Sequence, residues 1–370
     1  MANPFQKFLS FGKLALWRKK NDRVLGIDVG ASSVKIVQLR RSKGRVILET
    51  YGEIATGPYR DLSVGQVAVL TTEKRAEAIK YLFKESNVTT NQASFGIPLG
   101  SSLLVTIEIP KVEADMLAKV IPIEARKYIP VPISEVSLDW WVIPRKDLDP
   151  SADAGKLEVL IVAIHNSTIN QYQSLAKTMS LQTAFLEIET FSAMRSSLSG
   201  EMATTAILDL GAGTTKMVIV DHGIVKLSHT IGKGSQDISM AISRSLGLDF
   251  GKAEEVKRQV GLVERLEDGR NISTSVNSTL EYIFTDVNKV ITDFQTRERK
   301  VVNKIVLLGG GSLLKGLVDV AGRSFSAPVV LGQPFAKVEA PAFLEPILDE
   351  VGPTFAVALG LALRHLQSLD

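Results

Sequence analysis

Two short segments of this chain share one pattern, and the second follows the first after about 180 residues. Residues 24–37 and residues 205–219 each contain an apolar run, an Asp, a turn of glycine and hydroxyl residues, a Lys and a second apolar run. Apolar runs bounded by small residues are typical of buried strands joined by a tight turn. The repeat therefore predicts two related halves, each built around a hairpin with Asp28 or Asp209 at its bend.

Two such hairpins that face each other can hold a polyphosphate between their turns. Backbone N–H groups and hydroxyls would contact the phosphate oxygens, and the carboxylates of Asp28 and Asp209 would hold a magnesium ion through bound water. The residues expected around the phosphates are Gly30, Ala31, Ser32, Ser33 and Lys35 in the first hairpin and Gly211, Ala212, Gly213, Thr214 and Thr215 in the second.

Two further motifs follow the same logic. Glu189 stands 20 residues before Asp209 and is a candidate to orient a water for attack on the terminal phosphoryl group. Glu254 and Lys257 lie in a predicted helix over residues 252–260 and are candidates to contact the ribose and base.

A glycine run completes the set. Gly309, Gly310, Gly311 and Ser312 follow an apolar strand expected over residues 304–308. Glycines would let an adenine lie against the main chain. A helix expected from this run to about residue 323 would direct its N-terminus at phosphate.

Each of these residues also has a purely structural interpretation. Either aspartate could be a turn residue that bonds its own backbone, and Glu254 with Lys257 could be an ordinary surface pair one helical turn apart. Glu189 and Lys35 could be solvated. Because both aspartates carry the same flanking residues, the repeat favours the nucleotide interpretation.

Composition narrows the function classes. The chain has 370 residues, enough for two or three domains, and contains no cysteine, which excludes disulfides and thiolate metal sites. No stretch reaches about 18 uninterrupted apolar residues, so no transmembrane helix is expected. The net charge of the chain is +3, and residues 1–22 alone contribute +4, so the remainder carries about −1. This charge balance argues against nucleic-acid binding by the body of the protein.

The basic arm of residues 1–22 is partly amphipathic. Phe5, Phe8, Leu9 and Leu16 gather on one side of a helical wheel. One interpretation is a helix that lies on an anionic membrane surface. The other interpretation is an irregular tail, or a helix that docks on the body of the protein or on a partner.

The pattern along the chain predicts an α/β protein with an insertion. A self-contained β-α-β-β-α unit of about 80 residues interrupts the first half. Within it, Trp140 and Trp141 would face opposite ways on a strand, one into the core and one toward a partner groove. The expected divisions are the arm 1–22, a first lobe 23–97 and 184–203, an inserted domain 98–183, and a second lobe 204–370 with a helical part at about 236–302.

The order of these motifs resembles the actin-like ATPase superfamily, which includes actin, sugar kinases and Hsp-type chaperone ATPases. The resemblance implies a two-lobed fold of duplicated ribonuclease H-like halves that binds ATP with Mg²⁺. Lys35 stands where actin has a phosphate-contacting Lys, and Glu189 where several members have a catalytic Glu or Gln. Ala212 stands where chaperone-type ATPases have Gly, so the resemblance implies ATP binding more firmly than turnover, with slow or absent hydrolysis.

Within this superfamily the chain is similar to the FtsA/PilM branch. The insertion is placed as in FtsA, which implies an SHS2-like domain, and the segments 124–132, 138–140, 245–250 and 356–364 look like signatures of the PilM family. The resemblance covers about residues 23–366.

The PilM resemblance implies a cytoplasmic, ATP-binding scaffold peripheral to the inner membrane, in type IV pilus or type II secretion-like assembly. Its implied partner is the cytoplasmic N-terminal peptide of PilN, seated between the insertion and the first lobe, with other inner-membrane pilus components, the assembly motor and a second copy of the chain as further partners. One alternative is an FtsA-like, membrane-tethered filament protein of cell division. Another is a sugar kinase, which the absence of a sugar-site carboxylate motif disfavours.

Overall fold

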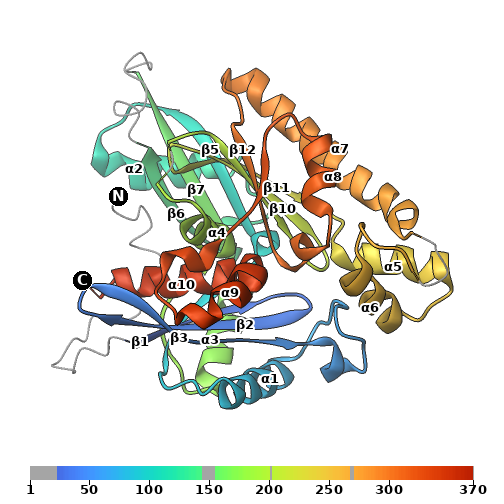
Figure 1. The fold of residues 1–370 in the computed structure, drawn as a ribbon. Helices are drawn as coiled ribbons and strands as arrows, with labels where there is room; N and C mark the ends of the chain where they lie inside the picture. The colour runs from blue at the N-terminus through green and yellow to red at the C-terminus, as the bar shows by residue number, and fades with distance from the viewer. Residues whose placement is uncertain (1–22, 144–154, 201, 267–270, 370) are drawn as a thin grey trace.

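The computed structural model describes residues 23–143, 155–200, 202–266 and 271–369, so the expected arm 1–22 lies outside the described residues (Figure 1). The described chain forms two five-stranded sheets and one three-stranded sheet, with helices packed on them. The edges of these sheets position the candidate site.

The first sheet has the strand order β3-β2-β1-β4-β8. Its strands are β1 (Arg23–Val29), β2 (Ser33–Ser42), β3 (Arg45–Ala55), β4 (Gln92–Ile97) and β8 (Gln182–Ile188). The first three strands are antiparallel, whereas β4 and β8 run parallel to β1. Because helices cover both faces, the central strand β1 is an almost continuous buried apolar run.

The second sheet repeats this arrangement in the order β11-β10-β9-β12-β13. Its strands are β9 (Thr205–Leu210), β10 (Thr215–Asp221), β11 (Ile224–Ile231), β12 (Lys304–Leu308) and β13 (Val329–Leu331). Three antiparallel strands are again followed by two parallel ones. The prediction of two related halves is therefore confirmed, although β11 was not predicted.

Helices complete both halves. The first carries α1 (Thr72–Glu85), whose N-cap Thr71 accepts a hydrogen bond from the Lys74 N–H at 3.3 Å, and α4 (Glu189–Ser197). The second carries α5 (Ser235–Leu246), α6 (Phe250–Val260), α7 (Ser273–Glu298) and α8 (Leu317–Ser324). The helix predicted over residues 252–260 is thus confirmed as α6.

The inserted unit follows the predicted order β-α-β-β-α. It contains β5 (Ser102–Pro110), α2 (Ala114–Ala125), β6 (Val136–Ile143), β7 (Lys156–His165) and α3 (Asn166–Thr178), with the sheet order β5-β7-β6. As expected, the two tryptophans face opposite ways: Trp140 packs in the core of the insertion, and Trp141 packs against the core of the first half. The insertion also lies beside the second sheet, where β5 contacts β11 (Figure 1).

The C-terminal helix α10 (Ala356–Gln367) returns to the first sheet, with α9 (Glu345–Val351) before it. A Cβ on Gly26 would lie 1.9 Å from the Ala358 carbonyl oxygen, and one on Gly360 would lie 1.9 Å from the Ser192 carbonyl oxygen, so both glycines permit close packing of α10. The expected second lobe of residues 204–370 must be corrected here, because α10 packs on β1, β2 and α4 of the first.

Among the described residues, the C-terminal stretch Ala342–Gln367 has the length and composition of a membrane span. In the structure this stretch contains α9 and α10, and every residue of α10 from Ala356 to Leu366 is buried against the first half. Its apolar character is accounted for by core packing.

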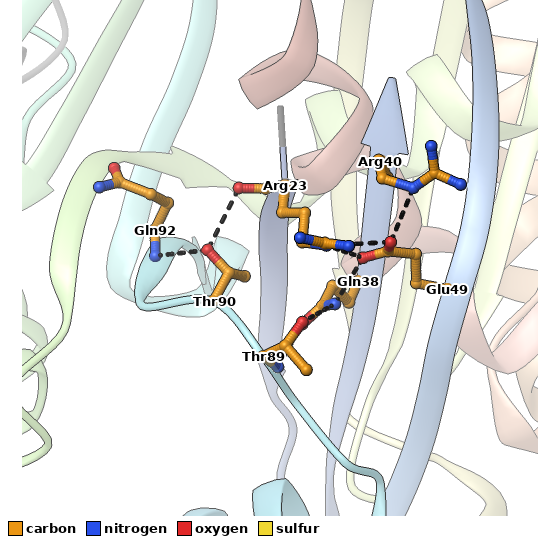
Figure 2. Close-up of polar contacts among 7 residues, drawn as sticks. All are labelled: Arg23, Gln38, Arg40, Glu49, Thr89, Thr90 and Gln92. Atoms are coloured by element: carbon orange, nitrogen blue, oxygen red, sulfur yellow. Dashed lines mark hydrogen bonds and ion pairs between the residues drawn. The ribbon is translucent and has the colours of Figure 1, made fainter. Parts of the chain in front are cut away.

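A polar network closes the end of the first sheet where β1 begins. Figure 2 shows Glu49 on β3 accepting hydrogen bonds from Arg23 at 2.9 Å and from Arg40 at 2.8 Å. Gln38, which is 1% exposed, donates to Glu49 at 2.7 Å and bonds Thr89 in both directions at 2.8 and 2.9 Å. These contacts tie three strands to the loop before β4 and fix the position where the chain enters β1.

Candidate functional site

A cleft of about 620 Å³ lies between the two halves. This volume falls in the range of small-molecule sites. Every residue expected at the two hairpins, at Glu189, at Glu254 and Lys257, and at 309–312 lines the cleft, except Thr215. The Thr215 hydroxyl instead donates to the Lys233 carbonyl oxygen at 2.8 Å and is buried.

The two hairpins enter the cleft with matching geometry. Asp28 lies opposite Lys35 in the β1–β2 ladder, and Asp209 lies opposite Lys216 in the β9–β10 ladder. The turn glycines match as well: a Cβ on Gly30 would lie 2.9 Å from the carbonyl oxygen three residues ahead, and so would a Cβ on Gly211. Each hairpin therefore presents a carboxylate and an ammonium group beside a turn that accommodates only a bare backbone.

Lys216 was missed by the sequence reasoning. Its ammonium group lies 2.8 Å from Glu189 and 3.6 Å from Asp209. Burial alone would lower the pKa of Lys216, but the two carboxylates outweigh it, so its pKa is raised and the side chain stays charged. The signal was available, since each hairpin has a Lys seven residues after its Asp.

Negative charge is concentrated at the floor of the cleft. Burial raises the pKa of Asp28 to about 6, a shift that Lys35 opposes and the Glu189 carboxylate reinforces. Within the described ranges, no group of three or more His, Cys, Asp or Glu side chains is arranged to hold a metal. Two hairpin carboxylates nevertheless fit Mg²⁺, which is usually held by one or two carboxylates together with substrate phosphates.

Glu189 begins α4 and is 7% exposed. One carboxylate oxygen accepts a hydrogen bond from the Leu99 N–H at 2.7 Å, and the other accepts one from Lys216 at 2.8 Å. Glu189 is therefore not a solvated surface residue, because both of its carboxylate oxygens accept a hydrogen bond from the protein.

Glu254 and Lys257 on α6 are buried, unlike an ordinary surface pair. They form an ion pair of 2.6 Å, and Glu254 also accepts hydrogen bonds from Ser239 at 2.5 Å and Arg258 at 2.7 Å. Burial would raise the pKa of Glu254, but the Lys257 ammonium holds it below its usual range. The pair forms a rigid wall of the cleft.

The glycine run follows β12 as expected, but the helix after it does not. Gly309 has a φ of +79°, and a Cβ there would lie 2.2 Å from the Asp209 carboxylate. A short 3₁₀ turn, Gly310–Leu313, comes next, and α8 begins only at Leu317, after Gly316 at a φ of +82°. The prediction of an α-helix N-terminus directly at Ser312 is therefore wrong. The left-handed backbone of Gly316 separates the 3₁₀ turn from the start of α8.

Residues 61–70 form a strap across the cleft that the sequence did not predict. The Val67 N–H donates to the Gln236 side-chain oxygen of α5 at 2.9 Å. Gly65, with a φ of +87°, passes so close to Glu254 that a Cβ would lie 2.7 Å from its carboxyl carbon. The strap joins the first half to α5 and α6 of the second.

Comparisons with known proteins follow this geometry. The family described as "Type IV pilus assembly protein PilM" matches residues 26–366. The solved structure titled "PilM-PilN type IV pilus biogenesis complex" is 26% identical, with a TM-score of 0.77, over 93% of this chain and 98% of that one. MreB5 of Spiroplasma citri bound to ADP is 12% identical with a TM-score of 0.53, over 95% of this chain and 98% of that one, and shows a shared fold.

Curated relatives include cell division proteins. FtsA of Neisseria meningitidis is 27% identical over 42% of this chain, which spans only 41% of the length of that protein. FtsA of Pseudomonas aeruginosa is 23% identical over 93% of this chain and 89% of its own length. The predicted actin-like fold is confirmed by these matches together with the duplicated sheets.

Proposed function

We propose, from the premise that this chain belongs to the PilM family of type IV pilus assembly proteins, that it is a nucleotide-binding scaffold of the pilus assembly machine. The observation that carries the proposal is the cleft in which two Asp–Lys hairpins face each other. The family match extends over nearly all described residues and favours pilus assembly over a sugar kinase.

The nucleotide we propose is ATP with Mg²⁺. Asp28 and Asp209 would hold the metal ion, Lys35 and Lys216 would neutralise phosphate charge, and the turn backbones would contact phosphate oxygens. The glycine run would leave room for the adenine, and Glu254 with Lys257 would border the ribose. The solved MreB5 structure of the same fold is bound to ADP, which agrees with this class of ligand.

Turnover is proposed to be slow or absent. A carboxylate that positions an attacking water needs an oxygen lone pair directed at that water beside the phosphate. Both Glu189 oxygens are already engaged, one by Leu99 and one by Lys216. These two bonds fix the orientation of the Glu189 carboxylate, so it can position a water only where one of its remaining lone pairs faces the terminal phosphate.

The partner we propose is the cytoplasmic N-terminal peptide of PilN, since the similar solved structure is titled as a PilM–PilN complex. The inserted domain offers apolar contact: Met116, Ile123 and Tyr128, on and after α2, are 40%, 60% and 46% exposed. Its strand β6 lies at the edge of its sheet. An edge strand has backbone groups that an extended peptide can pair with.

Titration of a synthetic PilN N-terminal peptide tests the partner. We expect Ile123→Glu to weaken binding by about tenfold or more, because it places a charge on the apolar surface. Val263→Glu is the matched control, since Val263 is 65% exposed on the second half. Equal binding by wild type and Ile123→Glu would contradict docking on the insertion, and no binding to wild type would contradict the partner.

A location peripheral to the inner membrane is also proposed. β1 begins at Arg23, at the end of the first sheet that the Glu49 network closes (Figure 2). The basic arm 1–22 joins the body there and would carry the proposed membrane contact. Vesicle co-sedimentation of the full chain and of a chain lacking residues 1–22 tests this contact, and equal binding would exclude it.

An FtsA-like filament is the second candidate, favoured by the 23% identity to Pseudomonas aeruginosa FtsA over 93% of this chain. Sedimentation with Mg-ATP distinguishes the two candidates. A filament would pellet, whereas an adaptor would stay in the supernatant alone or as a small homo-oligomer. The assembly motor and other inner-membrane pilus components remain proposed partners of the adaptor.

A further inference from the structure

Glu189 lies where the cleft, the first half and the insertion meet. Its carboxylate bonds Lys216 of the second hairpin on one side and the backbone of Leu99 on the other. Leu99 lies two residues after the end of β4, is 5% exposed and opens the short turn Leu99–Ser101 that leads into β5. One side chain therefore connects a cation of the second hairpin to the backbone at the start of the insertion.

The insertion is tied to the second half at another place. The Lys226 ammonium group on β11 pairs with Glu158 at 2.8 Å, and the Ser228 hydroxyl donates to the Leu104 carbonyl oxygen at 3.2 Å. Figure 1 shows β5 and β11 on the same side of the molecule, and the two strands are in contact. The insertion thus bridges both halves, and a change in their relative position must be transmitted to it.

We infer that Glu189 is a positioning residue that couples the terminal phosphate of a bound nucleotide to the attachment of the insertion. This inference rests on the proposed nucleotide site. Lys216 has one buried carboxylate partner at 2.8 Å and a second at 3.6 Å, so a terminal phosphate in the cleft competes with Glu189 for its ammonium group.

The consequence for the insertion follows from charge. Glu189 is buried, and loss of Lys216 leaves its carboxylate with a single backbone donor. A buried carboxylate without a counter-ion is costly, so the side chain reorients and the Leu99 bond weakens. The Leu99–Glu189 bond is then weaker with a bound triphosphate than with a bound diphosphate. A nucleotide switch requires such a difference in interaction free energy between its two states.

Glu53 provides a matched control in the same cleft. Its carboxylate lies 3.3 Å from Lys35, so it pairs with the cation of the first hairpin as Glu189 pairs with that of the second. Glu53 lies on β3, and none of its described partners belongs to the insertion.

Hydrogen exchange of the Leu99 amide, followed by overlapping peptic peptides or NMR, tests the coupling in the full chain. Samples are wild type, Glu189→Ala, Glu189→Gln and Glu53→Gln, each alone, with Mg-ADP and with a non-hydrolysable Mg-ATP analogue. Calorimetry on the same samples reports nucleotide affinity.

In wild type, the triphosphate is expected to speed Leu99 exchange by about tenfold or more relative to Mg-ADP, as loss of a hydrogen bond to a charged group implies. Glu189→Ala should exchange fast in all states. Glu189→Gln keeps an oxygen for the Leu99 N–H but loses the ion pair, so it should stay slow with both nucleotides. Glu53→Gln should keep the wild-type difference in Leu99 exchange between the two nucleotides, even if its nucleotide affinity changes.

Two results would overturn the coupling. One is triphosphate binding to wild type with unchanged Leu99 exchange, which would leave the proposed nucleotide site intact. The other is a full nucleotide response in Glu189→Ala. Absence of any nucleotide binding to folded wild type would instead overturn the proposed function, and the coupling with it.

Discussion

Asp209 and Lys216 lie opposite each other in the β9–β10 ladder, with 3.6 Å between carboxylate and ammonium. Asp28 and Lys35 occupy the equivalent positions in β1–β2. The cleft is therefore symmetric in its charged groups as well as in its strand order. The symmetry implies that the two lysines contribute comparably to phosphate binding.

Removal of either lysine should weaken nucleotide binding. Lys216→Met and Lys35→Met are each expected to raise the Kd for Mg-ATP by about tenfold to a hundredfold, because each loses a charge-assisted contact with phosphate. Calorimetric titration measures the change. The control is Lys226→Met, which removes an equally buried ion-paired lysine from β11, outside the cleft. A Lys216→Met protein that binds as tightly as wild type would remove Lys216 from the site.

Asp28→Asn should stabilise the nucleotide-free protein while it weakens Mg²⁺-dependent binding. Burial raises the pKa of Asp28 from 3.8 to about 6, so the unfolded chain loses this proton more readily than the folded one. The free energy of unfolding therefore falls as the pH rises from about 4 to 6, and the full penalty, at most about 3 kcal/mol, remains at pH 8. Urea denaturation at pH 8 and pH 4 checks this. An equal gain at both pH values would contradict the electrostatic cause.

Acid should destabilise the protein through His365. Burial lowers the pKa of His365 from 6.5 to about 4, so the unfolded chain binds this proton first. Stability that is present above pH 6.5 is lost as the pH falls toward 4, by about 1.4 kcal/mol per pH unit. His365→Gln should flatten this part of the stability curve. An unchanged slope in His365→Gln would contradict the assignment.

Loosening the strap should speed nucleotide exchange. Gln236→Ala removes the acceptor for the Val67 N–H, a neutral hydrogen bond worth about 1 kcal/mol, so release of a fluorescent ADP analogue should be about fivefold faster in stopped flow. Gln295→Ala is the matched control, since Gln295 accepts from the Val302 N–H at the same 2.9 Å far from the cleft. Identical release rates in both variants would show that the strap does not limit exchange.

Much of this architecture could be predicted from local pattern. The two hairpins, the β-α-β-β-α insertion and the strand before Gly309 have strong periodicity and clear turn residues. The repeat also indicated that Asp28 and Asp209 would meet, since duplicated strands present equivalent ends.

What the sequence did not reveal depends on long-range contacts. The strap of residues 61–70 is bonded to Gln236 and passes close to Glu254, and both residues lie far away in the chain. The return of α10 to the first sheet depends on close approach at Gly26 and Gly360. The delayed start of α8 depends on the left-handed Gly316. In each case the deciding contact or backbone angle has no local sequence pattern that would predict it.

The most direct test of the central claim is calorimetric titration of Mg-ATP, with Mg-ADP in parallel, into wild type and Asp209→Ala. The account predicts micromolar binding to wild type with a measurable difference between the two nucleotides. It also predicts that Asp209→Ala loses at least about tenfold in affinity with an unchanged melting curve. Equal affinity in a folded Asp209→Ala protein, or no binding to folded wild type, would contradict a nucleotide cleft built from the two hairpins.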